Sequence, residues 1–573
     1  MVTRQVRAKE SSLAELSSLL SVCDTSKSKS GDTGWVQVPN PNMTVRNALA
    51  DEAQHLDDLV KSVAMHPELL HAAMAARPGA LQTVQLSYGW EVFVVEDVRH
   101  AVVPTLRGAR RGPGFPVTPN MRRTSPKKPV IDDMSYYIQT FGCQMNVSDS
   151  ERMAAELERK GYHATDDPKK SALYLLNTCA LRDHAEQKVY SYLGPHAQRK
   201  WDAPSEVTLV VAGCVAQQEG DKLLSRVPEV DIVMGPQYAN RIGEVLDDFA
   251  ENMMQIVAVD PIHIQEDFSK PVRSSKITAW VNIIYGCLEK CSYCVVPNTR
   301  GLEQSRTMES IRAELQGLAR DGYREVVLLG QNVDAYGRDL YPKRTFSDLL
   351  RFIHDVDGIE RVRFTTGHPR YISENLITTV AELPKVMEHF HVPPQSGDNG
   401  VLKEMGRGYT RERYMDIARR VRKRMPDASI CADTIVGFPG ESEEAFENTV
   451  DMVKQVVFDS NMVRAYSARP NTTAGLREDQ VEEEVKARRL AVMNRLMREQ
   501  AEKRSQRYLG RRVEVLVEGV NEKVDGEVMG RERSNRVVFF EGAAEEYVGK
   551  IAVVEVDEAF AFSLRGRVIG EAW

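Results

Sequence analysis

Three cysteines in one short segment of this chain have the type and spacing that point most directly to chemistry. Cys287, Cys291 and Cys294 follow an apolar run at 281–285 in a C-x3-C-x2-C pattern. Thiols this close in sequence can converge on one metal centre, whereas disulfide geometry disfavours pairing among them. We therefore expect this group, called the loop triad below, to bind a metal ion or an iron–sulfur cluster.

The number of available ligands separates two kinds of site at the loop triad. A structural zinc site takes four ligands, and this segment supplies three with no histidine nearby in sequence. An iron–sulfur cubane held by three cysteines leaves one iron open for an exogenous ligand. The cluster is favoured, and a zinc-binding structural protein remains the alternative.

A second set of three cysteines closes three apolar runs of strand character, at 136–143, 173–179 and 207–214. Helical stretches follow these runs, which favours a parallel sheet with crossover helices. The carboxyl ends of parallel strands share one edge, so we expect the three cysteines to meet there as a second three-thiolate site. Three unrelated buried cysteines are the alternative. This N-terminal triad consists of Cys143, Cys179 and Cys214.

A second alternating series follows the loop triad. Amphipathic helical segments separate six strand candidates, which predicts a partial (βα)6 barrel open at one side for a large substrate. The loops that follow such strands are where this architecture carries its chemistry. The strand candidates are 279–285, 325–330, 361–366, 388–392, 429–436 and 461–466.

The last part of the chain, 507–570, reads as short strands with glycine-bearing turns, the pattern of a small β-barrel. Its cations, amide and aromatic rings at 531–540 suit single-stranded RNA, although a barrel core explains the aromatics equally well. Two basic segments, 407–424 and 486–507, are candidates for phosphate contact, with solvated helix faces as the alternative. The residues of the 531–540 group are Arg531, Arg533, Asn535, Arg536, Phe539 and Phe540.

Composition restricts the function classes. The 573 residues are 42% hydrophobic and 27% charged, as in ordinary globular proteins, and this length predicts several domains. Eight cysteines are too few for a disulfide scaffold and suit a reducing compartment. The net charge of −7 gives no overall attraction for nucleic acid, so RNA binding must come from local patches. No apolar run of about 18 residues predicts a membrane span.

Residues 1–130 differ from the rest of the chain in composition and sequence pattern, and we interpret them as an extension. Its start is compatible with an organelle transit peptide or a disordered tail. The stretch 107–129 carries seven cations and no acid, and predicts a basic linker. We expect a mitochondrial or plastid location if the extension is a transit peptide, and a cytoplasmic one otherwise.

The loop triad and its surroundings resemble a known family. The text CLEKCSYC is similar to the cysteine motif of radical S-adenosylmethionine enzymes. With TFGCQMN, NTCALRDHAEQKV, LGQNVDAYG, FTTGHP, QSG, RGYTRE and DTIVGFPGE, the chain resembles the MiaB-type tRNA methylthiotransferases over about residues 134–570.

The resemblance implies an α/β architecture of three domains: an N-terminal cluster domain (134–250), a TIM-like radical SAM core (273–505) and a TRAM β-barrel (507–570). It also implies two [4Fe–4S] clusters and S-adenosyl-L-methionine as cofactors. The loop triad would hold the cluster that cleaves S-adenosylmethionine to a deoxyadenosyl radical, and the N-terminal triad an auxiliary cluster that carries the sulfur.

The resemblance further implies residues that contact S-adenosylmethionine, with less support than the cysteines have. Cys431 and Cys23 belong to neither triad, and we expect both to be non-ligands. The expected contacts to S-adenosylmethionine are Tyr293, Gln395, Ser396 and Asp433.

The expected reaction is methylthiolation at C2 of N6-isopentenyl adenosine beside the anticodon of tRNA. Two loops, 394–398 and 468–473, depart from the family pattern, so the substrate is less secure than the reaction. Threonylcarbamoyl adenosine and a ribosomal protein are alternative substrates, and a cluster-binding RNA-binding or regulatory protein without catalysis is an alternative of another class. Expected partners are tRNA and an electron donor such as flavodoxin or ferredoxin, with the protein a monomer.

Overall fold

The computed structural model describes residues 134–180, 185–264, 270–570 and 572–573, together with the backbone of six strands nearer the N-terminus. The chain divides into two compact units, Met1–Ala109 and Arg110–Trp573. The predicted transit peptide and basic linker lie outside the described residues, except where they overlap β1 and β6 (Arg110–Arg111).

The first unit contains an antiparallel sheet in the order β2-β3-β1-β5-β4. Within the stretch 81–98, β4 and β5 pair as antiparallel strands of this sheet. The strands are β1 (Thr3–Ala8), β2 (Trp35–Gln37), β3 (Met43–Arg46), β4 (Leu81–Leu86) and β5 (Gly89–Val95).

The second unit begins with a seven-stranded sheet in the order β6-β12-β11-β10-β9-β7-β8. Its strands pair in parallel except for β6. All six residues of β9 are buried, as expected for a parallel strand covered on both faces. The strands are β7 (Ser135–Thr140), β8 (His163–Ala164), β9 (Leu173–Thr178), β10 (Thr208–Gly213), β11 (Ile232–Met234) and β12 (Ile256–Ala258).

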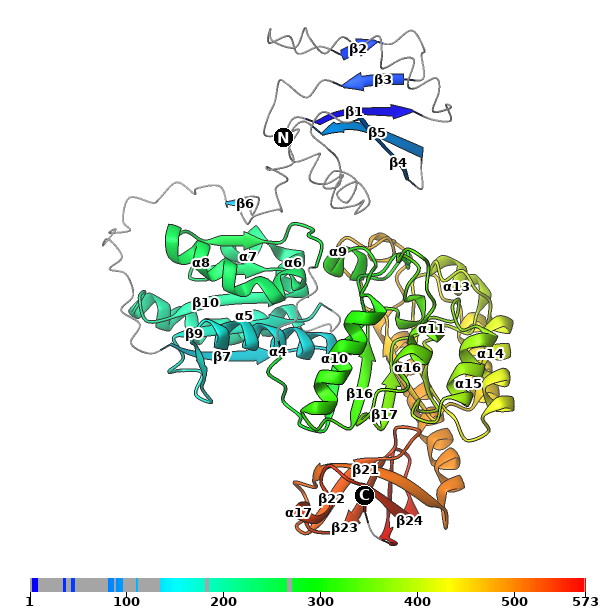
Figure 1. Ribbon diagram of the computed structural model, residues 1–573. Helices are drawn as coiled ribbons and strands as arrows, with labels where there is room; N and C mark the ends of the chain where they lie inside the picture. The colour runs from blue at the N-terminus through cyan, green and yellow to red at the C-terminus, as the bar shows by residue number, and fades with distance from the viewer. Residues whose placement is uncertain are drawn as a thin grey trace. The chain divides into compact units, whose positions relative to one another are not determined.

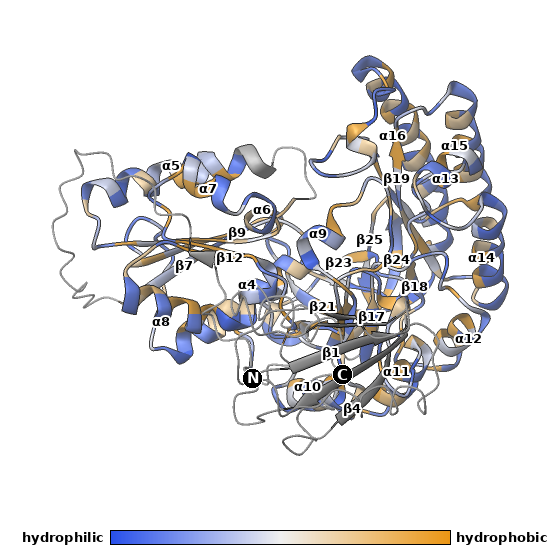
Figure 2. Ribbon diagram, turned by 90° about the horizontal axis from the view of Figure 1, so that it is seen from above, coloured by the Kyte–Doolittle hydropathy of each residue, from blue (hydrophilic) through white to orange (hydrophobic). Residues whose placement is uncertain are grey.

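Helices cover both faces of this sheet. Figure 2 shows α5 (Ala185–Asp202), α6 (Cys214–Glu219) and α7 (Asp221–Arg226) on one side of the strands. On the other side lie α4 (Gln144–Arg159) and α8 (Ile242–Asn252), which follows the short helix η3 (Pro236–Arg241). The strands and helices predicted for this region are therefore present in the expected parallel α/β arrangement.

The middle of the chain forms the predicted partial barrel (Figure 1). Its strands run parallel in two groups, β13-β16-β17 and β18-β19-β20, which a parallel bridge between Val362 and Val386 connects. Within the described residues β13 and β20 each have one neighbour in these groups, so the barrel is open between them. The strands are β13 (Thr278–Asn282), β16 (Glu325–Leu329), β17 (Arg361–Phe364), β18 (His389–His391), β19 (Ser429–Val436) and β20 (Ser460–Ala465).

Most of the barrel helices begin at a hydroxyl side chain that accepts a hydrogen bond from the first helical turn, which fixes where each helix starts. No helix in the described ranges is both long and apolar enough to cross a membrane. The helices, with their capping residues where present, are α10 (Met308–Arg320, Thr307), α11 (Phe346–Ile353, Thr345), α12 (Glu374–Glu382, Ser373), α14 (Arg411–Arg424, Thr410), α15 (Glu443–Val456, Ser442) and α16 (Glu483–Ser505).

The C-terminal part is a closed five-stranded barrel in the order β21-β22-β23-β25-β24. Buried and partly exposed residues alternate along β23, which places one face of the strand in the apolar core of the barrel. The strands are β21 (Arg512–Val520), β22 (Glu527–Arg531), β23 (Val537–Glu541), β24 (Ile551–Ala559) and β25 (Ser563–Val568).

Two buried arginines of β17 join this closed barrel to the partial barrel. Arg361 donates hydrogen bonds to the carbonyl oxygens of Arg531 (2.6 Å) and Glu514 (2.9 Å). Arg363 donates to the carbonyl oxygens of Arg533 and Glu532, both at 2.8 Å, and its Nε lies 2.7 Å from Glu325 Oε2. These contacts therefore connect side chains of one domain to main-chain oxygens of the other.

Replacing Arg363 by methionine should destabilise the protein by about 3–5 kcal/mol, because Glu325 would be left buried without its counter-ion. Arg351→Met is the matched control: its pair with Glu382 is about half exposed, and we expect its loss to cost about 1 kcal/mol or less. Urea unfolding followed by circular dichroism compares the two, and equal shifts of the midpoint would contradict the assigned role.

Candidate functional site

The N-terminal triad lies at one edge of the seven-stranded sheet. Cys179 directly follows β9, Cys214 is the first residue of α6 after β10, and Cys143 caps the N-terminus of α4 after β7. The three strands are neighbours, with Thr140 opposite Asn177 and Gly213 opposite Thr178. The structure thus brings the three predicted cysteines to the same carboxyl edge.

Two glycines allow the chain to approach closely at this edge. Gly142 has a φ of +129°, and a Cβ there would lie 2.6 Å from Cys179 Cβ and 3.1 Å from its Sγ. Gly213 has a φ of +93°, and a Cβ there would lie 2.4 Å from the carbonyl oxygen of Thr178. Neither position has room for a side chain, so glycine at both sites is a condition for bringing the cysteines together.

Buried amides hold the backbone beside these cysteines. Asn146 Nδ2 donates to the carbonyl oxygen of Thr178 (2.7 Å), and Asn177 Nδ2 donates to the carbonyl oxygen of Asn146 (2.8 Å). The Cys143 thiol donates to Asn146 Oδ1 at 3.4 Å. The triad is therefore supported by side chains that cross from α4 to β9.

The loop triad lies between the short strand β14 (Ile284–Tyr285) and helix α9 (Val296–Arg300). Its backbone is fixed at both ends: Cys287 N donates to Gly301 O (3.1 Å), and Ser292 N donates to Met405 O (3.0 Å). A Cβ at Gly286 would lie 2.0 Å from Leu302 O, so this turn also requires glycine. The loop is held against two separate segments of the partial-barrel domain.

The electrostatics of the loop triad disfavour bare thiolates. Burial raises the pKa of Cys287 to about 12, and the neighbouring Cys294 and Cys291 contribute to the rise. Burial likewise raises the pKa of Cys294 to about 11. Binding of a metal centre must therefore displace protons from these thiols.

A buried arginine faces the loop triad. Arg407 Nη1 lies 3.4 Å from Cys291 Sγ, and Nη2 donates to Pro393 O at 3.0 Å. Its guanidinium also lies over the ring of Tyr409. The sequence analysis did not predict Arg407 as a site residue, although Arg407 is the first residue of the RGYTRE motif.

The donor set of both triads suits iron–sulfur clusters, because all six cysteines are free thiols and thiolates are the ligands of such clusters. The glycines at 142, 213 and 286 provide the close backbone approach around them. Among the residues that the structure describes, no histidine, cysteine, aspartate or glutamate group of three or more is arranged to bind a single metal ion.

Two of the predicted S-adenosylmethionine contacts meet where the chain after β18 runs beside β19. Gln395 has a φ of +66° and its N–H donates to Asp433 O at 3.1 Å. Asp433 Oδ2 lies 3.1 Å from His391 Nε2. Because His391 Nδ1 accepts from Thr366 N (3.2 Å), Nε2 carries the proton and donates to Asp433. Sequence reasoning missed His391, although its place at the end of a predicted strand was a usable signal.

The other two predicted contacts are placed differently. Tyr293 packs beside the apolar residues Phe438 and Tyr466 next to the loop triad. Ser396 is fully buried, with its Oγ 3.3 Å from Thr449 Oγ1 of α15 and accepting from Asp398 N. The side chain of Ser396 thus holds the loop rather than facing a ligand.

The two triads are linked through the contact between their domains. Val295, directly after Cys294, packs into the apolar core that contains Cys214 and Val215. Tyr285, two residues before Cys287, packs with Met145 and Cys143. Both ends of the loop triad therefore contact the sheet edge that carries the N-terminal triad.

Part of each basic segment is engaged by contacts inside the fold, and phosphate binding stays a prediction for the remaining cations, which are exposed. Arg422 donates to carbonyl oxygens at the end of α15, and Arg420 pairs with Glu374 at 3.0 Å. In the second segment, Arg489 pairs with Glu441 at 2.7 Å, and Arg507 pairs with Asp459 at 2.6 Å.

Three members of the 531–540 group are engaged inside the fold. Arg533 pairs with Glu388 of the partial barrel at 2.7 Å, and Arg536 is buried beside Tyr508. Phe540 is fully buried in the core of the closed barrel. Arg531, Asn535 and Phe539 are partly exposed, and RNA contact by these three stays a prediction.

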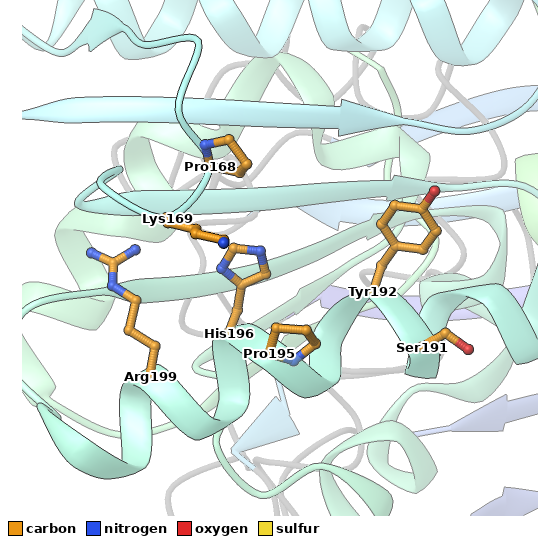
Figure 3. A pocket seen from close by; sticks show the side chains of 7 residues that line it. All are labelled: Pro168, Lys169, Ser191, Tyr192, Pro195, His196 and Arg199. Atoms are coloured by element: carbon orange, nitrogen blue, oxygen red, sulfur yellow. The ribbon is translucent and has the colours of Figure 1, made fainter.

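One cavity of about 530 Å³ has none of the six triad cysteines in its lining. Pro168 and Lys169 of its lining belong to the loop before β9. The His196 ring in it stacks on Tyr174 with centroids 3.7 Å apart, and burial lowers its pKa. Figure 3 shows its lining residues, Pro168, Lys169, Ser191, Tyr192, Pro195, His196 and Arg199.

Comparison with known proteins divides the chain into three matched regions. Residues 135–235 match Uncharacterized protein family UPF0004, residues 281–453 match the Radical SAM superfamily, and residues 506–569 match the TRAM domain.

Solved structures give weaker likenesses. The radical S-adenosylmethionine methyltransferase TsrM from Kitasatospora setae is 16% identical over 60% of this chain and 74% of its own, with a TM-score of 0.47. The cobalamin-dependent S-adenosylmethionine radical enzyme OxsB is 10% identical over 77% and 70%, with a TM-score of 0.42. At these TM-scores, we draw no conclusion about this chain from either structure.

The barrel with its cysteine loop and the match to residues 281–453 define an enzyme of the radical SAM superfamily. The succession of UPF0004, radical SAM and TRAM domains is consistent with a MiaB-type methylthiotransferase. The resemblance predicted from the sequence motifs is confirmed by this order of domains.

One buried carboxyl near the barrel mouth gives a pH-dependent prediction. Burial raises the pKa of Asp334 to about 8, although its oxygens accept from His368 N at 2.8 and 3.0 Å. A folded-state pKa above the unfolded value means that this group's stability contribution falls as pH rises from about 4 to about 8.

Asp334→Asn should remove that part of the pH dependence while costing little at pH 7, because the amide resembles the protonated acid. Thermal unfolding of both metal-free proteins at pH 5.5 and 7.5 measures it. If Tm falls by the same amount from pH 5.5 to pH 7.5 in the wild type and in Asp334→Asn, the raised pKa is wrongly assigned to Asp334.

Proposed function

We propose that this protein is a tRNA methylthiotransferase that adds a methylthio group to C2 of N6-isopentenyl adenosine at position 37, beside the anticodon. The observation that carries the proposal is the meeting of two cysteine triads across one domain contact, through Val295 and Tyr285. A radical generator and a sulfur carrier must act on the same base, so their proximity is what this chemistry requires.

The loop triad would hold a [4Fe–4S] cluster with S-adenosylmethionine, and the N-terminal triad a second cluster. Together they would supply a deoxyadenosyl radical and the sulfur to be transferred. Arg407 places a permanent positive charge beside Cys291. Tyr293, Gln395 and Asp433 would contact S-adenosylmethionine, with Ser396 fixing the loop that carries Gln395.

The open side of the barrel supports a substrate that enters as an extruded base. Asp433 and Met462 are register partners on β19 and β20. The neighbours Ala432 and Val436 pack toward the helices, so Asp433 and Met462 face the interior of the barrel. Met462 is 55% exposed there and offers an apolar surface for a base or its isopentenyl group.

The TRAM match supports nucleic acid as the partner, and we propose tRNA with a flavodoxin or ferredoxin as electron donor. Deleting the gene and measuring tRNA nucleosides by mass spectrometry tests the substrate. The methylthio-isopentenyl nucleoside should disappear and return with the wild-type gene. Loss of methylthio-threonylcarbamoyl adenosine or of a ribosomal-protein modification instead would assign the alternative substrates.

Substituting one cysteine of each triad should separate the two roles. Cys287→Ala should abolish both deoxyadenosine formation and methylthiolation, because the cluster that cleaves S-adenosylmethionine loses a ligand. Cys143→Ala should abolish methylthiolation and retain deoxyadenosine formation. Both products are measured by liquid chromatography after anaerobic reconstitution, and identical loss of cleavage in both variants would argue against separate roles. If the protein is a non-catalytic RNA-binding or regulatory protein, the wild type itself would form neither deoxyadenosine nor methylthiolated nucleoside.

Gly142→Ala should lower the iron and sulfide content by about half, because the new methyl group displaces Cys179 and one of two clusters is lost. Gly161→Ala is the matched control. Its φ is also positive, at +90°, but a Cβ there meets only Met134 Sδ at 3.9 Å. Both changes strain the backbone by about 1–2 kcal/mol. Equal iron content in the two variants would remove the support that Gly142 gives to the second cluster.

A further inference from the structure

Arg300 belongs to the radical domain by sequence but is buried against the N-terminal domain. It lies six residues after Cys294, at the end of α9, and is 6% exposed. Its Nη2 lies 2.7 Å from Asp149 Oδ2, and its carbonyl oxygen accepts from Gln237 Nε2 at 3.2 Å. A Cβ at the following Gly301 would lie 2.4 Å from that Gln237 nitrogen, so the segment fits closely.

The Arg300 guanidinium also reaches the N-terminal triad. Its Nη2 donates to Asn146 Oδ1 at 3.3 Å, the same oxygen that accepts from the Cys143 thiol at 3.4 Å. Cys143 and Cys214 are both close enough to raise the pKa of Arg300. A permanent positive charge thus stands beside two of the three thiols, with Asp149 as its counter-ion.

A fixed charge in a buried site changes the energy of any redox centre next to it. A positive charge stabilises the more negative, reduced form of an iron–sulfur cluster and raises its reduction potential, whereas a carboxylate lowers it. Arg300 is supplied by the segment that starts at the loop triad. The radical domain therefore supplies a positive charge to the surroundings of the N-terminal triad.

We propose that Arg300 is a positioning residue that couples the two sites: its charge sets the reduction potential of the cluster at the N-terminal triad, and its contacts hold that cluster beside the loop triad. The catalytic part of this inference rests on the proposed function. The redox part needs only a cluster at the N-terminal triad.

A second buried arginine offers a matched control for a merely structural role. Arg273 lies 2.7 Å from Glu314 of α10 and 3.5 Å from Glu151 of α4, with its side chain 3% exposed. It therefore also ties α4 to the radical domain through a buried ion pair. Its partners are these two acids and the carbonyl oxygen of Trp280, rather than the environment of the cysteines.

The first measurement isolates the cluster of the N-terminal triad. In the full-length chain carrying Cys287→Ala, Cys291→Ala and Cys294→Ala, its potential is determined by a redox titration monitored by electron paramagnetic resonance. Arg300→Gln should lower the potential, Asp149→Asn should raise it, and Arg300→Lys should stay near the starting value because the charge is kept. Arg273→Gln should leave it unchanged.

Two results would overturn the redox part. One is a potential that is the same in Arg300→Gln and Arg273→Gln. The other is a shift of the same sign in Arg300→Gln and Asp149→Asn. If Arg300→Gln fails to retain its cluster, the opposite-charge variant Asp149→Asn decides: an unchanged potential there contradicts the proposal.

The second measurement uses the protein with both clusters and tRNA. Arg300→Gln should raise the ratio of deoxyadenosine to methylthiolated nucleoside by about 10- to 100-fold, the range for residues that support metal ligands indirectly. Arg300→Lys should be intermediate, because an ammonium keeps the charge but lacks the planar fork. An unchanged ratio in Arg300→Gln would refute the coupling. A wild-type protein that forms deoxyadenosine but never methylthiolates tRNA would refute the proposed function and leave the redox result standing.

Discussion

The burial of segment 295–301 in the neighbouring domain is the constraint on which the arrangement of the chemistry depends. Val295 enters the apolar core of the N-terminal domain, and Arg300 pairs with Asp149 in the interior. A buried ion pair is costly to leave half made, so the two domains cannot slide past each other without losing it. The cysteine loop directly before this segment is thereby held at a fixed position relative to the sheet edge.

The sequence was sufficient to predict those parts of the fold that follow from local periodicity. Buried runs such as 173–178 and 325–329 mark strands covered on both faces, and the residues after them must share one edge. This is why both triads could be located before any coordinates. Pairings such as that of Arg300 with Asp149 join residues far apart in sequence, and no periodic pattern specifies them.

Charge patterns left the prediction of free surface cations incomplete for a physical reason. Counting the arginines in 407–424 or 531–536 shows how many cations are present but not how many carboxylates and carbonyl oxygens they meet. Glu388 lies more than a hundred residues before Arg533, and Asp459 pairs with both Arg504 and Arg507. The same reason applies to His391. Its contact with Asp433 can be recognised only when β18 and β19 lie side by side.

The joint between the radical domain and the C-terminal barrel has a different consequence. On the side of the C-terminal barrel, Arg361 and Arg363 bind only main-chain oxygens, at residues 514 and 531–533. Every amino acid carries such an oxygen, so these contacts recognise the path of the backbone, and the Arg533–Glu388 pair adds a side-chain contact to them. Side chains on the outer surface of the C-terminal barrel take no part in the four main-chain contacts, so they are free to diverge in sequence while the attachment persists.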